Sequence, residues 1–389
     1  MANEEETRRR LGQFHFYPYP LGLPQPSSAR DKYDVVAAID FGTAFSGFAF
    51  SFNHRDGSED IYMNKAWGSA QGYSTLKTPT CILLNQDKKF VKFGFEAAEK
   101  YAELEDAQDK SFYFFDRFKM MLHGCEGTLD RHTLLEARNR KRLRALDIFS
   151  KALEYLKERA LKAILEHSGV EYRAKEAGLA SRRDPNQLII ALEPEAAAVY
   201  CRQRKLREFV EGKGEETVKD TLVPASTQYL VIDNGGGTMD VTAHEVGDDD
   251  SIKEIYHATG GDYGGTKVDN EFQDLLDKIF GKNFMDEFRR SHPSDSLELM
   301  NDFEVKKRAD RVMKGEVTRI RLPANFVNLL RHENGQDDNS IIRPHYKVDD
   351  VKISKDYLCL GSAIVRSLFE PAIASNRQSF EKASEAKCT

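Results

Sequence analysis

The sequence predicts an α/β protein made of two similar lobes, and a repeated pattern is the main reason. An apolar segment at 35–39 ends in Asp-Phe-Gly-Thr at 40–43, and a second strand-like segment follows at 47–52. The same order returns later, where an apolar segment at 229–232 ends in Asp-Asn-Gly-Gly-Gly-Thr and a strand-like segment follows at 240–246. Because helical sequence separates the copies, we interpret the pattern as a duplicated strand–turn–strand unit. Two such lobes facing one another would place both turns at a shared cleft.

Composition excludes several classes of protein. The chain of 389 residues has room for two or three domains of about 100–200 residues each. Its 57 Lys and Arg against 63 Asp and Glu give a net charge of −6, which argues against a nucleic-acid partner, because basic groups supply most of that affinity. No apolar run approaches the roughly 20 residues that span a membrane. Five scattered cysteines without a CxxC pair indicate reduced thiols and a cytoplasmic protein.

The beginning of the chain predicts no packed structure. A charged start without an apolar core is followed by a stretch rich in proline and small residues, so we expect residues 1–32 to be disordered. An exposed aromatic and proline motif for docking is the alternative. We expect ordered structure from Tyr33 onward, with a first lobe over 33–200 and a second lobe over 201–389.

Local patterns predict the individual elements. The run at 35–39 is apolar at every position, which is typical of a strand covered on both faces. Over 144–167, apolar residues recur at steps of three and four, which predicts an amphipathic helix. A short buried strand at 188–192 leads to Pro194, which fits the start of a helix. Glu193 lies just outside this helix, either as a catalytic carboxylate or as a charge that the helix dipole favours, and the segment leaves both open.

The two Asp-Gly turns indicate phosphate binding. Glycine lets a ligand approach the backbone closely, and successive N–H groups form a concave nest for anionic oxygens. Asp40 and Asp233 can hold Mg²⁺, directly or through its waters, and the hydroxyls of Thr43 and Thr238 add donors. A single turn of this kind is also compatible with an ordinary glycine hairpin. Two copies favour the phosphate interpretation, and the absence of GxxxxGK[ST] and of GxGxxG before a helix excludes P-loop and Rossmann sites.

Four segments resemble the nucleotide-binding domain of the 70 kDa heat-shock proteins, and the heat shock 70 kDa protein 12 branch in particular. They are IDFGTAFSGFAF, ALEPEAAAVY, VIDNGGGTMDVTAHEV and TGGDYGGTKVDNEF, in this order and spacing. The resemblance covers roughly residues 33–330. It implies an actin-like ATPase fold with two lobes, each built on a ribonuclease-H-like sheet, and with MgATP at the base of the cleft between them.

The resemblance also implies roles for individual residues. The positions that match nucleotide-binding motifs are Asp40, Gly42 and Thr43 in a first phosphate loop, Asp233, Gly235, Gly236, Gly237 and Thr238 in a second, Gly264 and Gly265 in a turn before Asp269, and Glu304, Lys307 and Arg308 on an adenosine-clasping helix. Those that would hold Mg²⁺, mostly through water, are Asp40, Asp233 and Asp240. The alternative interpretation of the 304–308 helix is a basic, solvent-exposed face without a role in binding.

Three residues are candidates for catalysis through the same resemblance. Glu193 matches the glutamate that helps to orient the attacking water, and Asp233 lies in the second phosphate loop. Lys119, in FFDRFKMML, is similar to the lysine near the γ-phosphate, where a cation stabilises phosphoryl transfer. A solvated surface lysine is the alternative for Lys119.

The sequence also departs from the family pattern. Ala44 and Phe45 stand where the family places a hydroxyl-bearing pair. The segment 169–186 is too short for the usual strand and helix of lobe I, so a central strand is expected to be missing. After LFEPAI the chain lacks the glycine-rich second adenosine motif, and no sequence corresponds to a peptide-binding domain. These departures predict a shortened second lobe, weak nucleotide binding and little or no hydrolysis.

Three functions follow from these observations. The first is a chaperone-type domain that binds ATP and hydrolyses it slowly, with co-chaperones or other proteins as partners. The second is a scaffold that binds nucleotide without hydrolysing it. The third is a small-molecule kinase of the actin-like superfamily, which would need a substrate-binding insertion and a base near the acceptor hydroxyl, and no segment stands out as either.

Overall fold

The computed structural model describes residues 35–52, 60–64, 67–68, 75–104, 111–122, 130–168, 191, 193–203, 226–248, 251–309, 314–334, 339, 346–347 and 350–385. The expected disordered segment at 1–32, the strand expected at 188–192 (apart from the backbone at 191) and the shortened segment at 169–186 lie outside these residues. The chain forms two compact units. Unit 1 contains residues 191–232 and 241–258 with the N-terminal 1–32, and unit 2 contains 33–190, 233–240 and 259–389.

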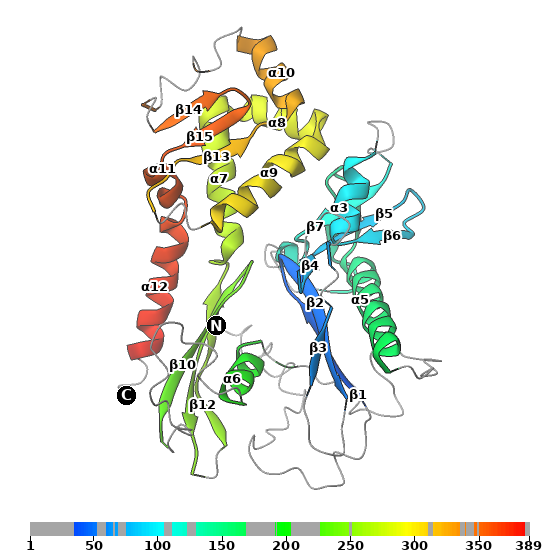
Figure 1. The fold of residues 1–389 in the computed structure, drawn as a ribbon, viewed down its shortest axis with the longest axis vertical. Coiled ribbons are helices and arrows are strands. Elements are labelled where there is room, and N and C mark those ends of the chain that lie inside the picture. The colour runs from blue at the N-terminus through cyan, green and yellow to red at the C-terminus, as the bar shows by residue number, and fades with distance from the viewer. Residues whose placement is uncertain are drawn as a thin grey trace. The chain divides into compact units, whose positions relative to one another are not determined.

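The first sheet of unit 2 contains the first Asp-Gly turn (Figure 1). Strand β1 (Val35–Phe41) pairs antiparallel with β2 (Phe45–Phe52), so that Asp40 lies opposite Gly47. Strands β3 (Ile61–Met63) and β4 (Thr78–Pro79) also pair with β2. The prediction that β1 is covered on both faces is wrong, because Val36 is 64% exposed. Among the described strands β1 pairs only with β2, which leaves it at an edge of the sheet.

A second group of elements packs beside this sheet. Strands β6 (Phe90–Phe93), β5 (Cys81–Leu84) and β7 (Tyr113–Asp116) form a sheet in that order, with helix α3 (Phe95–Ala102) following β6 and the 3₁₀ turn η2 (Met120–Leu122) following β7. The hairpin of β8 (Leu134–Glu136) and β9 (Arg142–Arg144) leads into helix α5 (Ala145–Ser168). The predicted amphipathic helix is confirmed. Its buried face is a row at steps of four, Ile148, Ala152, Leu156, Ala160 and Ile164.

The remainder of unit 2 is mainly helical. Its elements are α7 (Gly265–Phe280), α8 (Lys282–Ser291), α9 (Pro293–Lys307), β13 (Thr318–Arg321), α10 (Ala324–Asn334), β14 (Val351–Ser354), β15 (Tyr357–Leu360), α11 (Ser362–Ser367) and α12 (Glu370–Glu385). The strands pair antiparallel in the order β13-β15-β14. Phe272 of α7 stacks on Phe303 of α9 with ring centroids 3.9 Å apart, so the core fixes the two helices that flank the candidate site.

Unit 1 contains most of the sheet that the second copy of the repeat forms, whereas the turn of this copy, at 233–240, belongs to unit 2. Strands β10 (Gln228–Asn234), β11 (Met239–Val246) and β12 (Ile252–Gly261) form a sheet in that order, and helix α6 (Glu193–Gln203) belongs to the same unit. The structure thus confirms the predicted strands on either side of the second turn and begins α6 one residue earlier than expected, at Glu193. The α/β fold class is confirmed. The lobe boundary at residue 200 stays a prediction.

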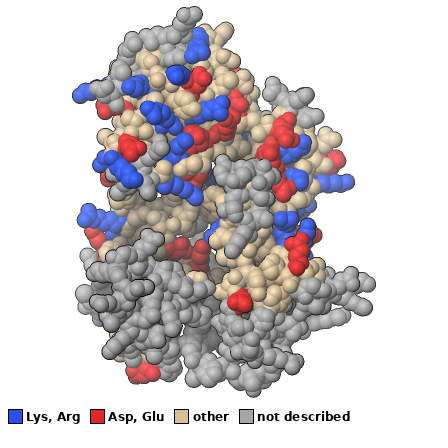
Figure 2. Space-filling view, viewed as in Figure 1, with Lys and Arg blue, Asp and Glu red and all other residues tan. Residues whose placement is uncertain are grey.

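Two further observations concern the helices and the surface of the described residues. None of the described helices combines the length and the apolarity that crossing a bilayer requires. On the face that Figure 2 shows, Lys and Arg side chains alternate with Asp and Glu over the described surface. That face therefore carries no broad patch of a single positive sign.

Candidate nucleotide site

Three glycine turns meet in unit 2. A Cβ atom added to Gly236 would lie 2.5 Å from the Cβ atom of Ala44, and one added to Gly237 would lie 2.5 Å from the Oγ1 atom of Thr43. A Cβ atom on Gly264 would lie 2.6 Å from the carbonyl oxygen of Gly235. The structure therefore brings together the turn after β1, the turn after β10 and the turn before α7. At 264 only glycine permits this approach, because a side chain would collide with backbone atoms, and at 236 and 237 a side chain would displace Ala44 or Thr43.

Backbone hydrogen bonds join the second turn to α7. The N–H group of Gly265 donates to the carbonyl oxygen of Gly235 at 3.2 Å, and that of Thr266 donates to Gly236 at 2.7 Å. The N–H group of Gly264 donates to Gly237 at 3.1 Å. The first turn of α7 thus uses the carbonyl groups of the glycine turn as its acceptors, which gives both segments a defined position.

Three carboxylates concentrate negative charge near these turns. Asp40, at the end of β1, forms an ion pair with Lys77. The hydroxyl of Thr238 donates to the Oδ2 atom of Asp240 at 3.2 Å. Burial raises the pKa of Asp233, and the charges of Asp240 and Asp40 raise it further, whereas Lys77 opposes them. The candidate magnesium ligands therefore lie close enough to one another to interact.

Lys119 lies at the first turn and not on a solvated surface. Its ammonium group donates to the carbonyl oxygen of Phe41 at 3.0 Å, and its side chain is half-buried. This contact positions a cation beside Gly42 and Thr43.

Glu193 begins α6 in unit 1 and is exposed. Its role in orienting water stays a prediction.

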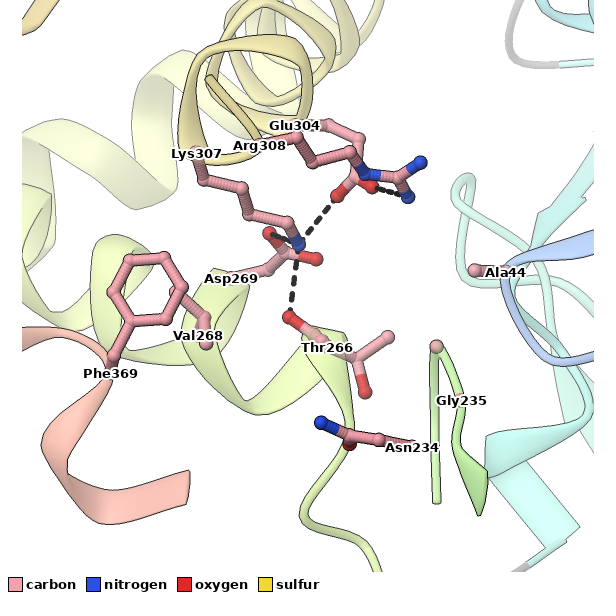
Figure 3. A pocket seen from close by; sticks show the side chains of 12 residues that line it. Ala44, Asn234, Gly235, Thr266, Val268, Asp269, Glu304, Lys307, Arg308 and Phe369 are labelled. Atoms are coloured by element: carbon pink, nitrogen blue, oxygen red, sulfur yellow. Dashed lines mark hydrogen bonds and ion pairs between the residues drawn. The ribbon is translucent and has the colours of Figure 1, made fainter. Parts of the chain in front are cut away.

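The predicted adenosine helix contributes a buried ion-pair cluster (Figure 3). The Nζ atom of Lys307 lies 2.6 Å from Asp269, 2.6 Å from Glu304 and 2.9 Å from the carbonyl oxygen of Gly265. The Lys307 side chain is only 7% exposed, so a basic face in solvent is wrong for this lysine. Arg308, more exposed, pairs with Glu304 and lies over the ring of Phe45 at 5.0 Å.

A cavity of about 580 Å³ lies between these groups. Val268 and Phe369 supply apolar surface, while Asp269, Glu304 and Lys307 supply charge. The other residues that line it are Ala44, Asn234, Gly235, Gly236, Gly265, Thr266 and Arg308. Its volume lies within the usual range for small-molecule sites.

Sequence reasoning missed two cations at this site. Arg117 follows β7 with a φ of 49°, pairs with Asp269 and lies 3.5 Å from Glu304. Lys77 precedes β4 and pairs with Asp40. Arg117 lies in FFDRFKMML, two residues before Lys119, but the resemblance assigns it no role, and Lys77 belongs to no motif. Only tertiary structure brings the two cations to the carboxylates.

By sequence, the chain is similar to heat shock 70 kDa proteins 12A and 12B. Heat shock 70 kDa protein 12A of Mus musculus is 34% identical over 420 residues, which cover 91% of this chain and 62% of that protein. The protein of the same name from Homo sapiens is 35% identical over 413 residues, with 90% and 61% covered. Heat shock 70 kDa protein 12B of Homo sapiens is 32% identical over 431 residues, with 93% and 62% covered. The chain therefore spans about 62% of the length of the curated relatives that it matches.

No protein-family model matches the chain. Among solved structures, MreB5 of Spiroplasma citri bound to ADP aligns with a TM-score of 0.40 and 12% identity, over 90% of this chain and 78% of that one. MreB5 bound to AMPPNP aligns with a TM-score of 0.37 and 11% identity, over 91% and 79%.

Proposed function

We propose that the chain, which is a homologue of heat shock 70 kDa proteins 12A and 12B, belongs to the 70 kDa heat-shock protein superfamily and binds ATP. The observation that carries the proposal is the meeting of three glycine turns beside a cavity of about 580 Å³. Such turns let phosphate oxygens approach the backbone, and the adjoining cavity has room for a nucleoside.

The proposed arrangement assigns each half of the ligand to a different part of the site. The phosphates lie at the turns of 42–44 and 235–238, where the ammonium group of Lys119 and the hydroxyl of Thr43 are the donors. The hydroxyl of Thr238 donates to Asp240 in this structure and would have to turn toward the phosphate. The nucleoside enters the cavity against Val268 and Phe369, where the carboxylate of Glu304 can accept hydrogen bonds from hydroxyl groups.

The carboxylates fit a hydrated Mg²⁺ ion better than a directly coordinated one. Asp40, Asp233 and Asp240 lie close enough to interact electrostatically, but among the described residues no three His, Cys, Asp or Glu side chains form a metal-binding group. Mg²⁺ bound to phosphate usually keeps several of its waters. We assign these three aspartates as acceptors for those waters, and the cation would neutralise phosphate charge.

We propose that hydrolysis is weak or absent. Ala44 and Phe45 bring no hydroxyl to the first turn, and the Ala44 methyl group contacts Gly236 instead. The hydrolytic step would depend on Glu193 to orient water. ATP binding without phosphate release would favour the nucleotide-gated scaffold over an ATPase.

We propose a chaperone role with protein partners from the superfamily. We propose a cytoplasmic location from the scattered cysteines.

Calorimetric titration of the full chain with MgATP, ADP and adenosine tests the binding proposal. We expect saturable binding of MgATP, and we expect Asp233→Asn to weaken it about tenfold, the effect of losing about 1.4 kcal/mol, while adenosine affinity changes little. Asp274→Asn, at an exposed position on α7, is the matched control. Equal losses for both ligands would reject the phosphate-side role of Asp233. The absence of any binding at millimolar MgATP would reject the function itself.

A further inference from the structure

Lys77 is a cation at the first phosphate turn to which neither motif nor resemblance assigns a role. It lies immediately before β4, and its ammonium group forms an ion pair with the carboxylate of Asp40. The side chain of Lys77 is 44% exposed and that of Asp40 is 34% exposed, so the ion pair is in contact with solvent. A partner for Asp40 is therefore present before any ligand binds.

The backbone beneath Lys77 is shaped for this contact. Asp40 lies opposite Gly47 in the β1–β2 pair, and β4 pairs with β2 through Ser46 and Thr78. A Cβ atom added to Gly47 would lie 3.2 Å from the Cγ atom of Lys77 and 3.0 Å from the carbonyl oxygen of Leu76. The stem of Lys77 thus passes over Gly47 toward Asp40. Glycine within a strand often marks such a close approach.

The charges around Lys77 explain what the ion pair does. Lys77 also acts electrostatically on Asp233, which interacts with Asp240. The ammonium group therefore stands among the carboxylates that would face a hydrated divalent cation. Two cations cannot occupy the same side of Asp40 without mutual repulsion, so the lysine and the metal ion compete for it.

We propose that Lys77 is a built-in counter-ion that competes with divalent cations for Asp40 and partly replaces them. In the metal-free protein, Lys77 then already neutralises the negative charge of Asp40 at the first phosphate turn. The consequence for nucleotide, which rests on the proposed ATP binding, is that ATP affinity depends less on Mg²⁺ than it would without the lysine. The competition itself requires no nucleotide and is tested without it.

Binding of Mn²⁺ to the full chain, followed by electron paramagnetic resonance in the absence of nucleotide, tests the competition. Lys77→Met removes the competing charge and should tighten Mn²⁺ binding about tenfold, as expected for one charge interaction of about 1.4 kcal/mol. Lys77→Arg should behave as the wild type. The matched control is Lys92→Met, because Lys92 is 48% exposed and pairs with Glu96 away from the turns. Adding Asp40→Asn to Lys77→Met should abolish the gain.

A second variant displaces Lys77 without removing it. Gly47→Val places atoms where the lysine stem passes, so it should raise Mn²⁺ affinity in the same direction as Lys77→Met. Circular dichroism of both variants establishes that they are folded. If folded Lys77→Met binds Mn²⁺ no more tightly than the wild type, the proposal is overturned, whatever the protein does with ATP.

The nucleotide arm uses a fluorescent ATP analogue in EDTA and in Mg²⁺. The gain in affinity on adding Mg²⁺ should be about tenfold larger in Lys77→Met than in the wild type, because the lysine supplies part of the charge neutralisation that the metal ion would supply. Equal gains in the two proteins would overturn the replacement role. If the analogue binds under neither condition, the proposed function fails, while the Mn²⁺ result still decides the competition.

Discussion

At the scale of single residues, neighbours with the same chemistry have different roles because of where the fold places them. Lys307 is 7% exposed and contacts two carboxylates, whereas Lys306 is 44% exposed and lies 3.9 Å from Asp302. Charge alone therefore does not identify a site residue. The presence of a glycine does not identify a structural role either, because a glycine is required only where a Cβ atom would collide with neighbouring atoms.

Gly264 and Gly265 allow a direct test of this point. A Cβ atom at Gly264 would lie 2.6–2.9 Å from three backbone atoms of the 235–237 turn, whereas one at Gly265 would meet its nearest neighbours at 3.6 and 3.7 Å. Gly264→Ala should lower the free energy of unfolding by about 1–3 kcal/mol, because rigid backbone must shift. Gly265→Ala should be close to neutral. Chemical denaturation of both variants measures the difference, and equal losses would show that the turns are not packed as described.

At the scale of elements, the sequence predicted those helices and strands whose apolar residues form a regular local pattern. The row of apolar residues predicted α5, and the repeated apolar segments predicted β1, β2, β10 and β11. The exposure of β1 could not be predicted, because a continuous apolar run does not reveal which neighbours a strand has. Arg117 and Lys77 were missed for a similar reason, since their partners are far away in sequence.

The sheet of unit 1 contains a buried titratable group whose effect on stability can be measured. His244 on β11 is 2% exposed, and its ring centroid lies 5.5 Å from that of Tyr229. Burial lowers the pKa of His244 below its usual value of 6.5, although the charge of Glu254 opposes this shift. The native state therefore binds fewer protons than the unfolded state as pH falls below about 6.5, and stability decreases there.

His244→Gln should reduce this pH dependence. We expect the wild type to lose thermal stability between pH 7.5 and 5.5, and we expect the loss to be smaller in the variant, because the residue that must remain neutral is gone. Scanning calorimetry at both pH values makes the comparison. His332→Gln is the control, because His332 lies on α10 in unit 2 and is exposed. An unchanged loss in His244→Gln would mean that other groups control acid stability.

At the scale of the whole of unit 2, one ion-pair cluster joins segments that are distant in the sequence. Arg117 follows β7, Asp269 lies on α7, and Glu304 and Lys307 lie on α9. No local pattern could have predicted this cluster, although the resemblance identified Glu304 and Lys307 one by one. The cluster borders the cavity, so we expect its integrity to affect both the stability of unit 2 and the shape of the candidate site.

Asp269 is the residue on which the cluster depends most. Its side chain is 1% exposed and accepts from both Arg117 and Lys307, so Asp269→Asn would leave two cations facing a neutral amide. Breaking a buried pair in this way typically costs 3–5 kcal/mol, and we expect about 3 kcal/mol because Glu304 remains to accept from Lys307. Asp274→Asn on the exposed face of the same helix should change stability by less than about 0.5 kcal/mol.

Denaturant unfolding of the single variants and of Asp269→Asn combined with Lys307→Met measures the coupling. If the two residues act as a pair, the double variant should be less destabilised than the sum of the single variants, because removal of both leaves fewer uncompensated charges. Additive losses would show that Asp269 and Lys307 do not stabilise each other. A loss no larger than that of Asp274→Asn would show that the cluster does not stabilise unit 2, and the cavity beside it would then need another source of rigidity.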